Sequence, residues 1–230
     1  MVTARPPRVL VTAGPTQEPL DPVRFISNRS TGQMGYAVAR AATDRGYAVT
    51  LISGPTALTP PPVHRYIPVH TARQMLAALR REFRRCDWLF MTAAVADFRP
   101  RTMRRAKLSS RRLPASFSLP FMRNPDLLAS VTRAKGRRLV VGWALETGPL
   151  VAATRAKQRA KRLDLVVANR ATRSGQPFGR QAVRVLLLDR AGRVTRLPSL
   201  SKEQLAGILL DKVETLWYRG ATVGPIAACC

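Results

Sequence analysis

The chain has little cysteine and no long apolar run. Its three cysteines, Cys86, Cys229 and Cys230, have neither a zinc-site spacing nor the number that a disulfide framework needs, which favours a reducing compartment. No apolar run reaches the roughly 18 residues of a membrane helix. The N-terminus also lacks the apolar region of a signal peptide. We therefore expect a cytoplasmic protein with no membrane partner.

Two common nucleotide-binding fingerprints are also missing. Gly14, Gly32 and Gly35 do not fit G-x-G-x-x-G, and no stretch reads G-x-x-x-x-G-K-[ST]. The two histidines, His64 and His70, lie in a proline-rich connection without a catalytic-triad or metal-ligand pattern. A Rossmann-type nucleotide-dependent oxidoreductase is therefore only an alternative hypothesis. The ribose-binding acid that it needs is absent after the second strand.

Acidic residues are scarce: the 13 Asp and Glu face 39 Lys and Arg, giving a net charge of +26. Only six of those cations are lysines. A basic nucleic-acid-binding protein is a second alternative. However, the arginines are spread along the chain, so we expect anionic small-molecule substrates and no specific nucleic acid. Where arginine is so dominant, a remaining lysine indicates a need for a compact ammonium; the candidates are Lys107, Lys157, Lys161 and Lys202.

What the chain does have is a long polar loop between its first strand and first helix. The apolar run at 8–14 predicts a buried strand, and a stripe of apolar residues ending before Gly46 predicts the helix. The loop at 14–35 is longer than the usual 2–6 residues, which is typical of functional loops. Ser30, Thr31 and Gly32 stand at the mouth of the helix, where free N–H groups and the helix dipole favour a phosphate.

Strands and helices alternate along the rest of the chain. This alternation predicts an α/β fold, a doubly wound and mostly parallel sheet with helices on both faces (Rossmann-like). We expect one domain over 1–230, a flap at about 100–118, and a C-terminal β-hairpin and helix at about 178–218. The carboxyl ends of the strands should line one crevice. That crevice should hold Gly14, Ala94 to Asp97, Ala144 to Thr147 and Asn169.

Eight segments in order carry a family resemblance over nearly the whole chain. They are VTAGPTQEPLDPVRFISNRSTGQMG, LISGPT, AAVADFRP, RNPDLL, VGWALETG, RAKQRAKRLDLVVAN, PFG and LSKEQLA. The chain resembles phosphopantothenoylcysteine synthetase, the ligase of coenzyme A biosynthesis that many bacteria fuse behind a flavin-dependent decarboxylase. The resemblance implies a ligase that joins 4'-phosphopantothenate to L-cysteine through an acyl-cytidylate. CTP would be the co-substrate, with Mg²⁺, while ATP is left open.

The resemblance also assigns roles to residues. It implies catalytic roles for Asn28 and Arg24 in the second half-reaction and for Lys161 at the triphosphate. The implied nucleotide contacts are Gly14, Ser30, Thr31, Gly32, Ala144, Leu145, Glu146, Lys157, Lys161, Phe178 and Lys202. The implied substrate contacts are Asn28, Ala94, Asp97 and Lys107, and no metal ligand is assigned. A homodimer is expected, without flavin in this chain. The resemblance leaves two alternatives open: a stand-alone synthetase that works with a separate decarboxylase, or an isolated domain of a fusion.

Overall fold

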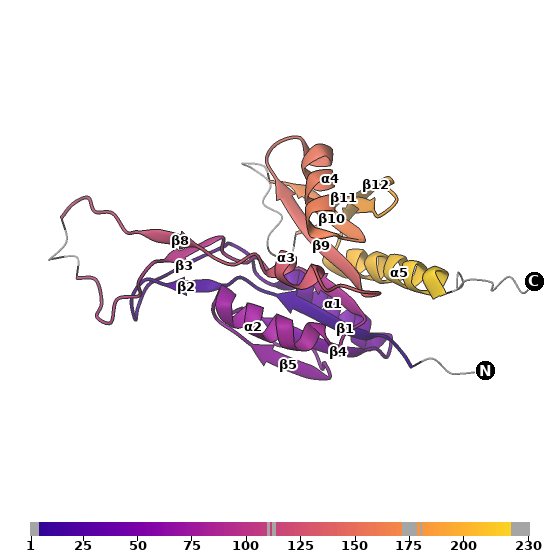
Figure 1. Ribbon diagram of the computed structural model, residues 1–230, viewed down its shortest axis with the longest axis horizontal. Helices are drawn as coiled ribbons and strands as arrows, with labels where there is room; N and C mark the ends of the chain where they lie inside the picture. Colours follow the sequence, from indigo (N-terminus) through magenta and orange to yellow (C-terminus); the bar gives the residue numbers. More distant parts are fainter. Residues whose placement is uncertain (1–4, 110, 112–113, 172–178, 180, 222–230) are drawn as a thin grey trace, which may run out of the picture.

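The computed structural model describes residues 5–109, 111, 114–171, 179 and 181–221 (Figure 1). Its main element is an eight-stranded sheet in the order β12-β11-β10-β9-β6-β1-β4-β5. Six neighbouring strands are parallel, and the hairpin at one edge is antiparallel. The strands are β1 Arg8–Ala13, β4 Ala48–Ser53, β5 Arg65–Pro68, β6 Trp88–Met91, β9 Leu139–Glu146, β10 Leu165–Arg170, β11 Val183–Asp189 and β12 Val194–Leu200. The predicted doubly wound sheet is confirmed.

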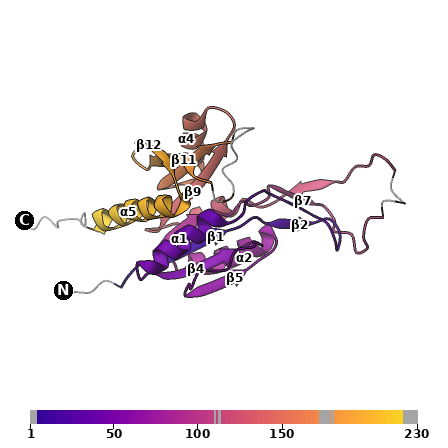
Figure 2. The same cartoon turned by 180° about the vertical axis from the view of Figure 1, so that it is seen from behind.

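Helices cover both faces of this sheet, which gives the molecule two cores (Figures 1 and 2). On one face lie α1, Gln33–Asp44, and α5, Lys202–Ala221; on the other lie α2, Ala72–Phe83, α3, Leu127–Thr132, and α4, Leu150–Lys161. Successive side chains of β1 serve the two cores in turn, because a strand alternates its faces. Val9 and Val11 pack against α1, and Leu10 packs on the α2 side. A strand buried on both faces must be apolar throughout.

The path of the chain reverses at β1. From β1 it passes through α1 to β4 and β5, then returns through α2 to β6 on the other side of β1. Connections that leave a sheet in opposite directions open a crevice at the carboxyl ends of the two strands, where α/β proteins bind ligands. Strand β6 ends at Met91, and residues 92–97 run along this crevice.

Strand β9 is longer than its neighbour β6. Their pairing ends at Met91 and Gly142, whereas β9 continues to Glu146 and stays paired with β10 on its other side. Among the described residues, no strand pairs with 143–146 on the β6 side. We call this segment the β9 overhang. It leaves one backbone edge of β9 available at the crevice.

Two short ribbons form an arm that projects from the carboxyl edge of the sheet (Figures 1 and 2). One pairs β2, Gln17–Pro19, with β3, Phe25–Ser27; the other pairs β7, Phe98–Pro100, with β8, Phe121–Arg123. The expected flap lies between β7 and β8. Sequence analysis assigned no strand here, because three residues carry no measurable periodicity.

Candidate active site

Two adjoining cavities open at the carboxyl ends of β1, β6 and β9. The α1 cavity, about 560 Å³, lies beside the N-terminus of α1 and the start of α5. The α4 cavity, about 770 Å³, lies between α3 and α4. Their shared lining consists of Ala93, Val95, Asp97, Trp143 and Lys157. They therefore form one cleft with two lobes.

The long first loop supplies one wall of the α1 cavity. Asn28, Ser30, Thr31 and Gly32 all line it, at the point where α1 begins. The hydroxyl of Ser30 accepts a hydrogen bond from the N–H of Gly32 at 3.3 Å. The first N–H groups of a helix have no partners within the helix, so this wall can bind an anion.

Asn28 is fixed by the backbone of the neighbouring crevice segment. Its Nδ2 donates to the carbonyl of Ala94 at 3.1 Å, and Ser27 Oγ donates to the carbonyl of Thr16 at 2.8 Å. The Oδ1 of Asn28 accepts no hydrogen bond from the described part of the chain. An oriented carboxamide oxygen is thus available to a ligand in the α1 cavity.

The three lysines of the cleft have different environments. Burial lowers the pKa of Lys157, and within the described residues its ammonium has no hydrogen-bond or ion-pair partner. Burial also lowers the pKa of Lys202, whose Nζ donates to the carbonyl of Gly179. Lys161 lines the α4 cavity and is paired with Asp126. Lys157 is the ammonium with most to gain from an anionic ligand, because the carboxylates of Glu146, Asp126 and Asp97 offset its burial only in part and leave its pKa lowered.

Sequence reasoning missed the role of Asp126. The segment at 124–126 indicates only the start of a helix, and Asp126 does cap α3 by accepting from the N–H of Ala129 at 2.8 Å. Its other oxygen pairs with Lys161. Burial acts to raise the pKa of Asp126, but the bonds from Lys161 and Ala129 outweigh it and lower that pKa. Thr92, Trp143 and Arg123 also line the cleft without a distinct sequence signal.

Close packing seals the β4 side of the crevice. A Cβ on Gly32 would lie 2.7 Å from Thr56 Cγ2, and one on Gly14 would lie 2.8 Å from the carbonyl oxygen of Gly54. Both glycines also have a positive φ, of 80° and 71°. Gly14 therefore allows the loops to meet and does not line either cavity. A dinucleotide lying across the switch point would need space on this side.

The β9 overhang contains three predicted nucleotide contacts. Leu145 lines the α1 cavity and is 43% exposed, whereas Ala144 is fully buried. The carbonyl of Glu146 accepts from the N–H of Ala171 at 2.9 Å, so it is held on the β10 side. Asn169, opposite Leu145 on β10, also lines the α1 cavity, as expected. Phe178 lies outside the described residues.

Two predicted site residues lie on the arm and line neither cavity. Arg24 follows β2 and donates to Asp21 and to the carbonyl of Leu108. Lys107 is the exposed neighbour of Leu108 on the flap. The structure therefore brings Asn28, Ser30, Thr31, Gly32, Ala94, Asp97, Leu145, Lys157 and Lys202 to the α1 cavity, with Lys161 at the adjoining lobe. It places Arg24 and Lys107 together, but elsewhere.

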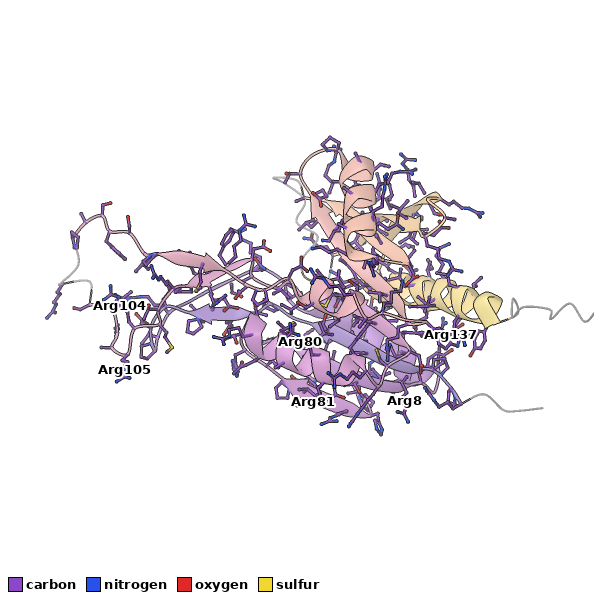
Figure 3. The ribbon with its side chains drawn as sticks, viewed as in Figure 1. Arg8, Arg80, Arg81, Arg104, Arg105 and Arg137 are labelled. Atoms are coloured by element: carbon purple, nitrogen blue, oxygen red, sulfur yellow. The ribbon has the colours of Figure 1, made fainter. Side chains whose placement is uncertain are left out.

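Positive charge is not confined to the cleft. Figure 3 shows Arg104 and Arg105 on the arm and Arg8, Arg81 and others on the body. Around the cleft, the described residues contain no group of three or more His, Cys, Asp or Glu side chains suited to hold a metal ion. Among the helices that the structure describes, none combines the length and apolarity that a bilayer crossing requires.

Comparison with known proteins assigns the chain to a family. The family model "DNA/pantothenate metabolism flavoprotein C-terminal domain" matches residues 5–216. The chain belongs to this family. Family relatives named "Coenzyme A biosynthesis bifunctional protein CoaBC" are 38% identical in Bacillus subtilis and 39% in Escherichia coli K12, each over 209 residues. These alignments cover 90% of this chain and 51% of each relative. The chain thus spans about half the length of the curated relatives it matches.

Solved structures agree with this membership. The crystal structure of the C-terminal domain of CoaBC is 34% identical, with a TM-score of 0.78 over 93% of this chain and 96% of that one. A Cab2 mutant in complex with phosphopantothenate-cysteine is 18% identical, with a TM-score of 0.74 over 94% of this chain and 89% of that one. The second likeness shows the fold alone.

Proposed function

We propose that this chain is a phosphopantothenate–cysteine ligase of coenzyme A biosynthesis that acts through an acyl-cytidylate. One observation carries the proposal: the free carboxamide oxygen of Asn28 lies in the same cavity as the N-terminus of α1 and two partly desolvated lysines, Lys157 and Lys202. An acyl-nucleotide reaction needs phosphate-binding groups and an acyl-orienting group in one space. The names of the CoaBC relatives support the same pathway.

In the first half-reaction, a carboxylate oxygen of 4'-phosphopantothenate attacks the α-phosphorus of CTP, and pyrophosphate leaves. Negative charge builds on the phosphorus oxygens, so fixed donors in a cleft lower the barrier. Ser30, Thr31 and Gly32 bind phosphate at the α1 N-terminus. Lys157 brings an ammonium group from α4 to the junction of the two lobes, where the reacting atoms meet, and Lys161 brings a second one to the adjoining α4 cavity.

In the second half-reaction, the amine of cysteine attacks the acyl carbon, and cytidine monophosphate leaves with the bonding electron pair. Asn28 aligns the incoming amine with the acyl group, because its Nδ2 is fixed on the carbonyl of Ala94 and its Oδ1 is free to accept a hydrogen bond from the N–H of the amine. The amine loses its proton to solvent or to a phosphate oxygen. The product is an amide, phosphopantothenoylcysteine.

Mg²⁺ fits this cleft as a partner of the triphosphate. The ion uses one or two carboxylates together with substrate phosphates, so it needs no all-protein cage. Asp97 lines both lobes, and within the described residues its carboxylate has no hydrogen-bond or ion-pair partner. Asp97 would hold the ion, which supplies charge neutralisation on the phosphates. CTP is the proposed nucleotide, with its base at the β9 overhang and near Phe178 and Lys202.

We also propose that the chain is a homodimer. The arm exposes large apolar side chains, among them Val23, Phe25, Phe98 and Phe121 at 42–61%. Burying such a surface against a second copy would remove it from water. Sedimentation of Phe25→Glu and of the wild-type chain tests this, since an unchanged dimer, or a monomeric wild type, would contradict it.

Pyrophosphate release tests the reaction. The wild-type chain should release pyrophosphate with CTP, Mg²⁺, 4'-phosphopantothenate and cysteine, and less with ATP. Asn28→Ala should still consume CTP but accumulate the acyl-cytidylate, and the isosteric Asn28→Asp separates the role of the carboxamide from its volume. Absence of release with every nucleotide would refute the ligase, and full product formation by Asn28→Ala would refute the role of Asn28.

A further inference from the structure

A buried carboxylate joins the two parts of the arm. Asp21 lies in the turn between β2 and β3, and its side chain is fully buried. Its Oδ1 accepts from the N–H groups of Val23 and Arg24, both at 2.7 Å. Its Oδ2 accepts from the N–H of Leu108 at 3.0 Å and from Arg24 Nη1 at 3.1 Å. Asp21 thus binds four donors on two segments that are 87 residues apart.

Arg24 closes the same contact from the other side. Its Nη1 also donates to the carbonyl of Leu108 at 2.7 Å, so Asp21 and Arg24 together bind both backbone groups of Leu108. The side chain of Leu108 is itself buried. The N–H that Asp21 accepts belongs to the peptide linking Lys107 to Leu108. The position of Lys107 therefore depends directly on Asp21.

We infer that Asp21 is a positioning residue that locks the flap at Leu108 to the turn before β3, holding Lys107 beside Arg24 for the reaction. The inference rests on the proposed ligase function. The same hairpin carries Asn28, three residues after Phe25, so the lock holds two of the proposed site residues, Arg24 and Lys107, on the hairpin that leads to a third. We call the contact of Asp21, Arg24 and Leu108 the flap lock.

A simple turn-forming role does not account for this geometry. An aspartate that only shapes a turn needs one oxygen to accept from the following N–H groups, and asparagine can do the same. Here the second oxygen faces two donors, so a carboxylate is required. The bond from Leu108, followed by those from Val23 and Arg24, lowers the pKa of Asp21 to about 2. Asp21 is therefore ionised throughout the neutral range.

Asp21→Asn tests the flap lock because it is nearly isosteric. The carboxamide oxygen can still accept from the N–H groups of Val23 and Arg24, but its NH₂ group now faces two other donors, the N–H of Leu108 and Nη1 of Arg24. The guanidinium of Arg24 stays in contact with water because its side chain is half-exposed. The variant therefore leaves no fully buried, unpaired charge. Asp44→Asn, an exposed aspartate on α1, is the matched control.

The rate of limited trypsin digestion measures how firmly the flap is held, and it does not depend on ligase activity. Arg104 and Arg105 lie exposed on the arm, as Figure 3 shows, and Lys107 is exposed beside them. Losing a charge-assisted hydrogen bond should speed cleavage at these sites about tenfold or more in Asp21→Asn. In the ligase assay, kcat should fall about tenfold, with the KM for CTP unchanged because the cleft is untouched. Asp44→Asn should match the wild type in both assays.

Every result decides between the alternatives. Cleavage and kcat at wild-type values would overturn the flap lock, and faster cleavage with a normal kcat would leave Asp21 a structural residue only. If Asp21→Asn fails to fold, Arg24→Met breaks the same contact. Faster tryptic cleavage of this variant would then support the flap lock, and cleavage at the wild-type rate would overturn it. If the wild-type chain has no ligase activity, the proposed function fails, while cleavage still tests the lock.

Discussion

Replacing Lys157 by methionine should change stability and ligand binding in opposite directions. The ammonium of Lys157 lies at the junction of the two lobes, is largely desolvated, and has no partner among the described residues. A methionine keeps most of the side-chain length and removes the charge. The free protein then loses a largely desolvated charge that Glu146, Asp126 and Asp97 compensate only in part, and the ligand complex loses a cation.

The two magnitudes follow from the environment of the ammonium. Relief of a partly buried charge should stabilise the free protein by about 1 kcal/mol, which raises Tm by about 2–4 °C in a chain of this size. Loss of a charge-assisted contact to phosphate costs about 1.5–3 kcal/mol. That cost weakens the binding of CTP by about 10- to 150-fold.

Calorimetry measures both effects on the same samples. Scanning calorimetry gives the Tm of the free protein, and titration calorimetry gives the Kd of CTP. Lys212→Met is the matched control, because Lys212 lies on α5 outside both cavities and should change neither quantity. The stability gain should shrink as pH rises, because the lowered pKa lets folded Lys157 lose its proton before the unfolded chain does.

Two results would refute this reasoning. A lower Tm in Lys157→Met would mean that the ammonium has a stabilising partner in the free protein. An unchanged Kd for CTP beside a raised Tm would mean that the α1 cavity does not bind the triphosphate.

Three further predictions concern single contacts. Asp126→Asn keeps the cap of α3 but frees Lys161, which is assigned to the triphosphate, so the KM for CTP should fall while Tm drops by no more than about 2 °C; a raised KM would contradict this. The lowered pKa of Asp21 means that its stabilisation is complete above about pH 4 and is lost as pH falls toward 2, so the protection of flap amides from hydrogen exchange, relative to the unstructured chain at the same pH, should fall over this range in the wild type and stay constant in Asp21→Asn. Gly32→Ala should lower the free energy of unfolding by about 1–2 kcal/mol because of the positive φ, and by a further amount because the new Cβ would clash with Thr56. Gly46→Ala also has a positive φ but lies in open space, so it should lose only the contribution from φ. Equal urea midpoints for the two variants would exclude the clash.

Much of the fold was predictable because the sheet is buried on both sides. Runs such as 9–11 and 165–168 are apolar at every position, and the connecting helices have clear stripes. The strand order then follows from a right-handed crossover rule and a single reversal. The arm could not be predicted, because its strands are three residues long and pair across turns or flaps that leave no repeat in the sequence.

The cleft was partly predictable for a similar reason. Residues that follow the ends of parallel strands, such as Ala94, Asp97 and Asn169, must gather at one edge. Pairings between distant segments were not predictable. The contact of Lys161 with Asp126 and that of Arg24 with Leu108 depend on how α3 and the flap pack, which periodicity does not encode.

The β9 overhang has a consequence for how selectivity can change. A recognition surface made of peptide groups is identical in every sequence that forms the strand, so a point substitution at Leu145 alters a side chain but leaves the N–H and C=O groups in place. In the proposed role of the overhang as the base-binding edge, a different base would need a shift in the register between β9 and β10, which would displace every residue from Val141 to Glu146 at once. A change in what the overhang binds therefore requires a change in the geometry of the whole strand. For the same reason, a single substitution in the overhang would not readily give resistance to a compound that binds its backbone.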